Sequence, residues 1–520
     1  MPKQKTDDLI QLIKSLTRAE KRHFRLFVRR NQASENILFL QLFDILDKYK
    51  EYDESVILKR LPAIKKTQLS NLKAHLYKQL LTSLRLVNKK HNEDIQIREM
   101  IDYASVLYTK GLYRQSLDVL EKAKIRAEKG KFRAAQLEII EFEKLLESQY
   151  VTNSMEGRAE QLIDESQRLN QVISHNNTIS NLSLKLYGLY LKVGYVRNRR
   201  DFEVVKGFFQ TNLPKVDFPQ LDFWGKIYYC QSFVWYYHMT QDFPMSYRYA
   251  QKWVDLFDEN PEMKAHNAAT YLKGLHLLLS ALFYTLQHER FLSTLKELHQ
   301  FYTAVDLHQD RNIEGLFHLF RFIHGIQQHY LEGTFSEGLE LVPELVQLID
   351  TDEYNWDDHR ILVFYYRIAC LYFGSGDNDN AIHYLNLIIN QKNPNYREDI
   401  QCFARILSLI AHFELGNSQL VEYQVKSVYR FLAKMHDLHA VQQAIFRFLR
   451  KSFKMRQAEI KNEFIELRDK LVSLQDDPYE RRPFLYLDII SWLESKIENR
   501  EVQAVIRQKF LKRKAQQNKK

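Results

Sequence analysis

The sequence predicts an all-α protein: an α-solenoid of about eight helical hairpins, preceded by a helical domain and followed by capping helices. A small or compact residue recurs along the chain in steps of 40 to 48 residues. Of the 520 residues, 15 are glycine and 10 are proline, too few for the frequent turns of an all-β protein. Apolar residues recur at helical spacing, and no alternation of strands and helices is visible.

The recurring residue marks the second helix of each predicted hairpin, where a small side chain lets two helix axes approach. The eight positions are Ser116, Ala159, Val204, Ser246, Thr294, Gly338, Ala381 and Val421. A fixed period of roughly 20 to 50 residues indicates a stacked array of repeats. Because each unit of such an array packs only on its neighbours, the chain length does not require several globular domains.

Charge separates the ends of the chain from its middle. Residues 1–90 hold 20 Lys and Arg against 9 Asp and Glu, and residues 500–520 hold 8 against 1. The whole chain carries a net charge of +10, so the segment between the two ends is mildly acidic. We expect a basic helical domain over 1–92, the array over 93–440, capping helices over 441–499 and a basic tail over 500–520.

The N-terminal domain is predicted to contain several short helices. Thr17 and Glu20 have the spacing of a capping box, which opens a helix. Further helices are predicted over 34–50, 53–61 and 67–87, with Pro62 ending the third. A short helix, a tight turn and a longer helix have the outline of a helix-turn-helix.

In that interpretation, seven residues around the long helix could face phosphates and bases. They are Lys65, Lys66, Gln68, Asn71, Lys73, His75 and Lys78. The turn carries no specific signature, and no β-wing sequence follows it. The alternative, which we favour, is that the basic side chains solvate the outside of a helical bundle that caps the array.

The clearest hairpin runs from Ile361 to Pro394. Its pattern of large, small and aromatic residues is Tyr365, Ile368, Ala369 and Tyr372, then the turn Gly376-Asp377, then Ala381 and Leu385. This unit resembles a tetratricopeptide repeat, and segments 108–117, 330–339 and 412–421 keep its turn glycine. The resemblance extends over roughly residues 96–440 and implies stacked hairpins with a concave groove.

The resemblance also implies which residues line the groove. In the clearest unit they are Val363, Tyr366, Cys370 and Phe373, and in the preceding unit Phe320, Ile323, Gln327 and Tyr330. These side chains are strongly apolar for a solvent-facing groove. An open groove could bind an apolar or amphipathic peptide, whereas in a tight superhelix the same residues would meet as core. The aromatic content of 13% favours partial closure.

The C-terminal part is predicted to close the array. A helix over 444–475 ends at 476–478, and the apolar segment that follows, 484–493, is placed to cover the last exposed face of a solenoid. A membrane-surface or partner-docking role is the alternative for that segment. We expect the tail over 500–520 to be solvated or frayed, with a nucleic-acid contact as the alternative.

The sequence argues against several classes of protein. No signal peptide is visible, and no apolar stretch approaches the roughly 18 residues of a membrane span. The three cysteines, Cys230, Cys370 and Cys402, are scattered and lack metal-binding spacing, which suits buried thiols in a reducing cytoplasm. No phosphate loop, nucleophile elbow or acid–base constellation is found, so we predict no enzyme activity, cofactor or metal.

The predicted function is a non-enzymatic, cytoplasmic interaction scaffold that binds a protein or peptide in a superhelical groove. The alternative is a nucleic-acid-binding regulator, in which the N-terminal domain contacts nucleic acid and the array senses a ligand or dimerises.

Overall fold

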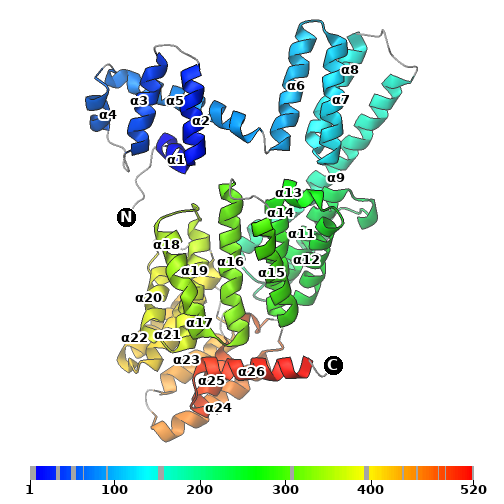
Figure 1. Cartoon of the computed structure of the whole chain (residues 1–520). Helices are drawn as coiled ribbons and strands as arrows, with labels where there is room; N and C mark the ends of the chain where they lie inside the picture. Colours follow the sequence, from blue (N-terminus) through cyan, green and yellow to red (C-terminus); the bar gives the residue numbers. More distant parts are fainter. Residues whose placement is uncertain are drawn as a thin grey trace. The chain divides into compact units, whose positions relative to one another are not determined.

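The computed structural model consists of helices joined by turns (Figure 1), and no strand occurs among the residues that it describes. Those residues are 8–30, 35–48, 54–62, 64–89, 92–149, 157–304, 310–391, 397–435, 438–452, 455–477, 479–485 and 488–517. The expected all-α class is therefore confirmed. The chain divides into two compact units, residues 1–171 and residues 172–520. The predicted boundaries at 92, 440 and 499 stay predictions.

The first five helices of unit 1 comprise one that was not predicted, the first, and four that follow the sequence pattern closely. They are α1 (Asp8–Ser15), α2 (Arg18–Arg30), α3 (Glu35–Lys48), α4 (Glu54–Arg60) and α5 (Lys66–Asn88). The capping box is present: the Thr17 amide donates to the Glu20 carboxylate at 2.7 Å, and the Glu20 amide donates to Thr17 Oγ1 at 3.2 Å. Phe24, Phe43 and Leu76 are in the apolar core of this bundle.

Four further helices begin in unit 1: α6 (Glu93–Thr109), α7 (Tyr113–Lys129), α8 (Arg133–Gln149) and α9 (Arg158–Val193). Helices α6 and α7 form a hairpin, in which buried Ser116 donates a hydrogen bond to the Ala104 carbonyl at 2.8 Å. Helix α9 has 36 residues and runs on into unit 2.

Unit 2 continues with helices that pack in chain order. They are α10 (Arg199–Asn212), α11 (Phe223–Met239), α12 (Phe243–Asp258), α13 (Glu262–His266), α14 (Ala268–Tyr284), α15 (His288–Ala304), α16 (Arg311–Glu332), α17 (Phe335–Gly338), α18 (Val342–Asp350), α19 (Asp358–Ser375), α20 (Asn378–Ile389), α21 (Glu398–Glu414), α22 (Ser418–Lys434), α23 (Ala440–Ser452), α24 (Gln457–Leu474), α25 (Ile489–Glu498) and α26 (Val502–Gln517). Short 3₁₀ turns lie at Phe218–Gln220, Leu339–Leu341 and Arg482–Leu485. Pro394, which closes the predicted unit, lies outside the described residues.

The hairpins share one turn geometry. A residue with positive φ lies in the connection between the two helices, and the fifth residue after it is buried in the first turns of the second helix. The pairs are Gly111 and Ser116, Gln241 and Ser246, Leu286 and Phe291, Gly333 and Gly338, Gly376 and Ala381, and Gly416 and Val421. Only a left-handed residue lets the chain reverse this tightly, which favours glycine.

The predicted repeat positions are thus right at five sites and need correction at three. Thr294 is buried, but it lies three residues beyond Phe291, which holds the equivalent place. Ala159 and Val204 are exposed. Ala159 is the second residue of α9, two residues after Gly157, whose φ is positive, and Val204 lies one residue before the buried Val205 of α10.

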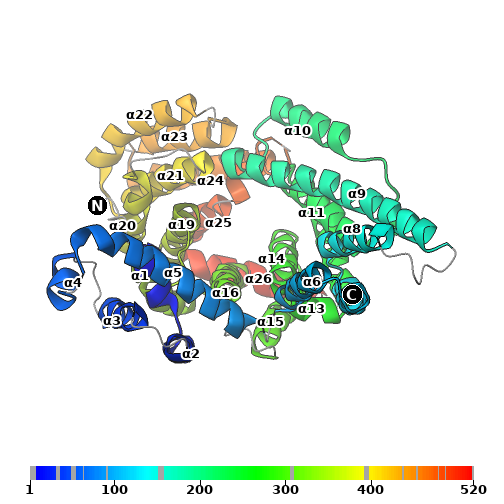
Figure 2. The same cartoon turned by 90° about the horizontal axis from the view of Figure 1, so that it is seen from above.

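Unit 2 closes on itself. Arg197, in the connection between α9 and α10, donates to the carbonyl of Met435 after α22 at 2.9 Å. Arg481 donates to the carbonyl of Gln241 at 2.6 Å, and the Arg397 guanidinium lies 5.6 Å from the centre of the Tyr190 ring. Figure 2 shows the result: the end of α9 and helices α11, α14, α16, α19 and α21 surround a common interior.

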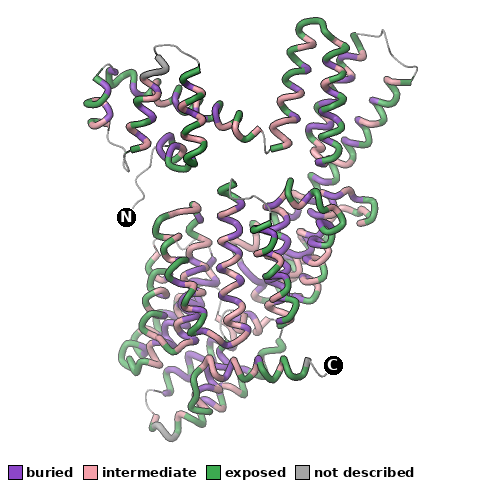
Figure 3. Tube along the Cα trace, in the orientation of Figure 1, coloured by how far each residue is buried: buried purple, intermediate pink, exposed green. Residues whose placement is uncertain are grey.

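Helix α26 is docked on unit 2, which corrects the expected frayed tail. Val505, Ile506 and Phe510 are buried, and buried residues also run along α16 (Figure 3). At Gly333 an added Cβ would meet the backbone nitrogen of Arg507 at 2.3 Å, so α26 lies against the turn after α16. Val505, Ile506 and Phe510 are spaced so that they lie on one face of α26. This spacing is typical of a helix that packs against the protein, but the basic charge of the segment led to the prediction of a solvated tail.

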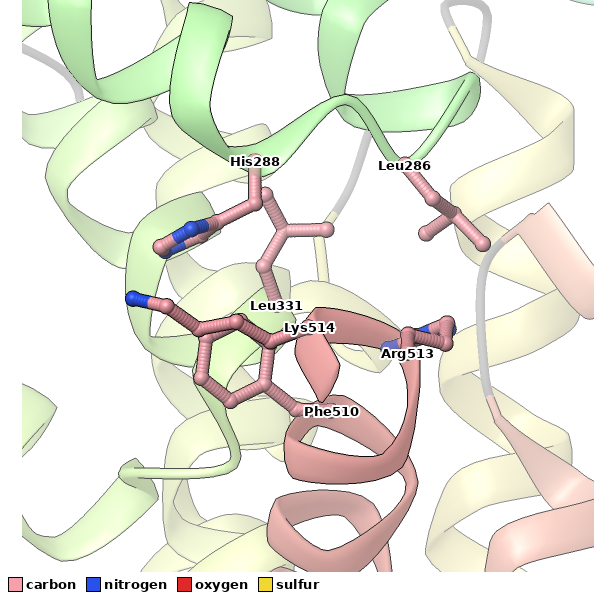
Figure 4. A pocket seen from close by; sticks show the side chains of 6 residues that line it. All are labelled: Leu286, His288, Leu331, Phe510, Arg513 and Lys514. Carbon is pink, nitrogen blue, oxygen red and sulfur yellow. The ribbon is translucent and has the colours of Figure 1, made fainter. Parts of the chain in front are cut away.

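A small cavity marks the contact of α26 with the turn before α15 (Figure 4). It is lined by Leu286, His288 and Leu331 on one side and by Phe510, Arg513 and Lys514 on the other. Its volume is about 10 Å³, close to the smallest space that holds one water. We interpret it as a packing seam, too small for a ligand.

Candidate functional site

The eight residues predicted to line a groove are all on α16 and α19, and none is exposed. Five are buried: Phe320, Gln327, Tyr366, Cys370 and Phe373; the other three, Ile323, Tyr330 and Val363, are half-buried. Phe320 stacks on the His276 ring of α14, with centroids 4.3 Å apart. Tyr330 donates to the Arg367 carbonyl of α19 at 2.5 Å. We call α11, α14, α16, α19 and α21, which surround the interior of unit 2, the inner helices. The predicted groove residues therefore pack between neighbouring inner helices rather than lining an exposed face.

Polar side chains join them on the inner helices. His276 Nδ1 lies 2.8 Å from His324 Nε2, and His324 Nδ1 lies 2.7 Å from Gln327 Oε1. A second group links α11 and α14: Tyr195 Oη lies 3.2 Å from His238 Nε2 and donates to Tyr284 Oη at 2.8 Å. We call these residues the interior cluster, together with the further residues described below. Those are Tyr187, Tyr190, Trp235, Lys273, Asp357, Arg360, Arg367, Arg397 and Asp399.

Burial keeps the histidines of the interior cluster neutral. It lowers the pKa of His238 to about 3, and nearby Arg397 lowers it further. Burial also lowers the pKa of His276 to about 3, with Arg367 adding to the effect. The pKa of His324 is lowered well below its usual value, first by burial and then by His276. A neutral histidine ring offers one donor and one acceptor, so these rings take part in hydrogen bonds without carrying charge.

Four cations lie on α14, on α19 or at the start of α21, and two of them are paired; Lys273 is exposed. Arg397 is held by the carboxylate of Asp399 at 2.8 Å, with both side chains buried. Arg360 lies 3.4 Å from Asp357. Lys273 of α14 and Arg367 of α19 make no side-chain hydrogen bond or ion pair to any residue that the structure describes.

Two buried N–H groups of the interior cluster have no acceptor within the described part of the chain: Arg367 Nε and Trp235 Nε1. Trp235 stands among aromatic rings, with centroids 4.8 Å from Tyr187 and 5.2 Å from Tyr190. Buried donors are normally satisfied, so two orphans in one interior need an explanation. Arg367 acts electrostatically on Tyr190, His276 and His324, which come from three different helices, so it lies centrally.

Sequence reasoning missed Lys273, Arg367, Trp235 and the three histidines. They form no recognisable motif in the sequence and are distributed over four helices: Trp235 and His238 on α11, Lys273 and His276 on α14, His324 on α16 and Arg367 on α19. The available signal was position: Arg367 lies four residues after Val363 and three before Cys370, on the same helix face as those predicted groove residues. The contacts that bring α9 and α21 together, by contrast, leave no local trace in the sequence.

The predicted nucleic-acid residues are on or beside α5, and the structure spreads them over different faces. Gln68, Asn71, His75 and Lys78 are exposed at a spacing that places them on one stripe. Lys65 is exposed at the start of the helix. Lys66 lies 3.1 Å from Glu54, and half-buried Lys73 has a lowered pKa because burial disfavours its charge.

Two further basic residues of the N-terminal bundle, both on α2, are paired with carboxylates of α3. Lys21 lies 2.7 Å from Asp47, and Arg25 lies 2.9 Å from Asp44 and 3.2 Å from Asp47. Part of the basic character counted from the sequence is thus neutralised by α3.

The described residues contain no metal-binding cluster, and their cysteines are buried. No group of three or more His, Cys, Asp or Glu side chains there could hold a metal ion. The three cysteines are buried thiols outside any disulfide, and burial raises the pKa of Cys230 and of Cys370 to about 12. Among the helices covered by the structure, none is long and apolar enough to cross a membrane.

Comparisons with known proteins add no relative. No family model, no curated protein and no solved structure matches the chain.

Proposed function

We propose that unit 2 is a non-enzymatic, cytoplasmic binding module that takes up a peptide, or a segment of a partner protein, in the interior enclosed by its inner helices. The observation that carries the proposal is the interior cluster: polar and aromatic side chains from several helices meet where a stable module would place apolar ones. Buried polar groups cost stability unless they are hydrogen-bonded. A core that contains many of them is therefore expected at a functional site. The shared turn geometry of the hairpins supports a tetratricopeptide-like array, the architecture that the sequence predicts.

The chemistry of the cluster suits a peptide. A peptide backbone brings one donor and one acceptor per residue, and both must be satisfied when it leaves water. His324 uses both ring nitrogens within the protein, whereas His238 and His276 each keep one ring nitrogen outside the hydrogen bonds described above, and such a nitrogen can donate to or accept from a peptide. The rings of Tyr187 and Trp235 add large apolar surfaces that peptide side chains can cover.

The same groups are poorly suited to catalysis. A general base works best with a pKa near the operating pH, whereas the pKa values of His238 and His276 are about 3. A cysteine nucleophile needs a low pKa, and those of Cys230 and Cys370 are about 12. These values support binding rather than reaction. The three buried thiols, which lie outside any disulfide, also suit a reducing compartment.

The test is selection from a displayed library of random peptides against the full chain. We expect a peptide to be selected, and its binding to be lost in Val363→Trp, which fills space between inner helices. The matched control is Leu420→Trp on the outer helix α22, where the side chain is 39% exposed. The proposal fails if no peptide is selected, or if both variants bind equally well.

A second candidate function is a nucleic-acid-binding regulator, supported by one observation. Gln68, Asn71, His75 and Lys78 form an exposed stripe along α5, and polar and basic residues on one helix face are what a recognition helix presents to a groove. The ion pairs of Lys66, Lys21 and Arg25 weigh against it, because they reduce the charge available to phosphates. Its test is the salt dependence of binding, given in the Discussion.

A further inference from the structure

We infer that unit 2 is a ring closed by a polar clasp, and that the ring opens at this clasp. The clasp consists of Arg197, which lies between α9 and α10, and Arg481, which follows α24. They contact segments 238 and 240 positions away in the chain, and Figure 2 shows the end of α9 beside α21. We call the junction that these two arginines span the seam. The inference goes beyond the proposed function, because opening can be measured without any ligand.

The seam is held by arginine contacts. Arg197 donates to the Met435 carbonyl at 2.9 Å and lies 3.8 Å from the Glu398 carboxylate. Arg481 donates to the Gln241 carbonyl at 2.6 Å. Each such contact adds little net stability, because water takes the place of the lost partner when the contact breaks. A junction that depends on a few of them is easily opened.

The buried apolar core connects the two sides of the seam only the long way round the ring. The cluster of α9–α12 shares Trp235 with the large cluster between α11 and α19. That cluster shares Tyr330 with the cluster of α19–α25. Among the described residues, the clusters next to the seam, which contain Val196 and Phe209, share no member with the cluster of α19–α25. Because apolar burial is the main stabilising force, the ring is weakest at the seam.

Two residues at the seam have an unfavourable backbone conformation. Arg397, at the start of α21, has a φ of 54°, and Gln241 has a φ of 62°. Neither is a glycine, so each left-handed conformation persists only because its surroundings hold it. Some of those holding contacts cross the seam: the Arg397 guanidinium lies against the Tyr190 ring, and Arg481 bonds to Gln241. These conformations therefore favour a seam that can change its state.

Helix α26 ties the C-terminal end of unit 2 to a different hairpin. Phe510 packs against His288 of α15, with ring centres 4.7 Å apart, and Arg507 donates to the Glu332 carbonyl of α16 at 3.1 Å. These contacts lie beyond the α11–α12 hairpin that forms one side of the seam. They can stay in place while α9–α12 separate from α21–α24.

The experiment measures, by pulsed electron resonance, the distance between two spin labels on opposite sides of the seam. Arg200→Cys and Lys434→Cys place the labels at exposed positions of α10 and α22. The native cysteines are buried, and buried thiols are inert toward such labels. A second pair, Glu340→Cys and Asn386→Cys, is exposed on neighbouring hairpins within the continuous core and is the reference.

We expect the parent to show a main short distance across the seam and a minor longer one that grows with salt, since salt screens the charge of Arg197 and Glu398. Changing Arg197 and Arg481 together to Ala should make the longer distance the main one. Arg321→Ala is the matched control: it removes two hydrogen bonds of 2.8 Å to Glu344 of α18, away from the seam. It should leave the seam distance as in the parent, and the reference pair should keep one distance in every variant.

The inference is overturned if the double variant keeps the distances of the parent. It is also overturned if the reference pair lengthens as much as the seam pair, because the whole array would then be loosened. Circular dichroism checks that the helices form, and Arg197→Ala alone takes the place of the double variant if that variant does not fold. Failure to select a peptide would overturn the proposed function and leave these distances unaffected.

Discussion

Gly333 and Gly376 occupy the same place in two hairpins but have different surroundings. Both have positive φ, of 67° and 93°. Nothing lies within 4 Å of a Cβ added at Gly376, whereas at Gly333 the added atom meets the backbone of Arg507 and Ile506 in α26. The first glycine serves the turn alone, and the second also lets α26 approach.

This difference predicts unequal effects of one substitution. Gly376→Ala should lower the free energy of unfolding by about 1 kcal/mol, the strain of a left-handed alanine. Gly333→Ala should add roughly 1–3 kcal/mol to that loss, because a backbone contact must separate. Urea unfolding gives both values, and trypsin should cut α26 of Gly333→Ala faster. Equal losses and equal cleavage would contradict the docking of α26.

The neutral histidines predict how stability depends on pH. Their folded pKa values, about 3 for His238 and His276, lie below the unfolded value of roughly 6.5. Below that pH the unfolded chain binds more protons, so stability falls as the pH drops. Each histidine contributes up to about 1.4 kcal/mol per pH unit. Denaturant unfolding between pH 7 and pH 5 should show this slope. His238→Gln should reduce the slope by up to about 1.4 kcal/mol per pH unit, the contribution of one bound proton. An unchanged slope in that variant would show that His238 is not held neutral.

At the scale of the helix, most of these hairpins place a small or compact residue five positions after the left-handed residue of the turn, with Phe291 as the exception. Ala381 is fully buried as the fourth residue of α20. Ala381→Trp should therefore destabilise the protein by roughly 1–3 kcal/mol or more through overpacking. Asn386→Trp, exposed on the same helix, is the control and should change the stability by less than about 0.5 kcal/mol. Thermal melting that leaves Ala381→Trp like the parent would show that α20 does not pack as described.

Helices with strong local signals could be predicted from the sequence, and those without could not. The capping box at Thr17 and the glycine turns at Gly111, Gly333, Gly376 and Gly416 gave helices and hairpins in the right places. Two turns have no glycine: Gln241 and Leu286 take its left-handed conformation. The Gln241 side chain bonds to Val196 and Arg481 there, a tertiary reason that no local pattern contains.

The positions of Ala159 and Val204 were assigned from spacing alone. Ala159 is the second residue of α9 and Val204 the sixth of α10, and the buried residues near the starts of these helices are Leu162 and Val205 instead. Which residue is buried depends on the helices packed against it, and a period in the sequence does not record that. The burial of the predicted groove residues depends likewise on neighbouring helices rather than on their own sequence.

At the scale of the whole chain, the basic N-terminal region raises the question of nucleic acid. The ion pairs of Lys66, Lys21 and Arg25 lead us to expect at most weak binding in a gel shift at low salt. Changing Lys65, Lys66 and Lys73 together to Ala should leave it unaltered. Tight binding that falls steeply with salt through counterion release, and that the triple change weakens, would instead make the regulator the leading function.

The interior cluster is the part of the account least accessible to sequence. It exists because residues about 240 positions apart meet, as Arg197 and Met435 or Gln241 and Arg481 do. Only that closure brings Arg397, at the start of α21, beside Tyr190 of α9. Sequence could indicate that the inner faces were unusually aromatic, and it left open whether they were exposed.

Amide hydrogen exchange of the full chain, free and saturated with its selected peptide, tests the central claim most directly. We predict slowed exchange along the inner helices α14, α16 and α19, and unchanged exchange in the outer helix α22 and in α2 and α5. Protection confined to α2 and α5, or to the outer helices, would contradict a binding site in the interior of unit 2.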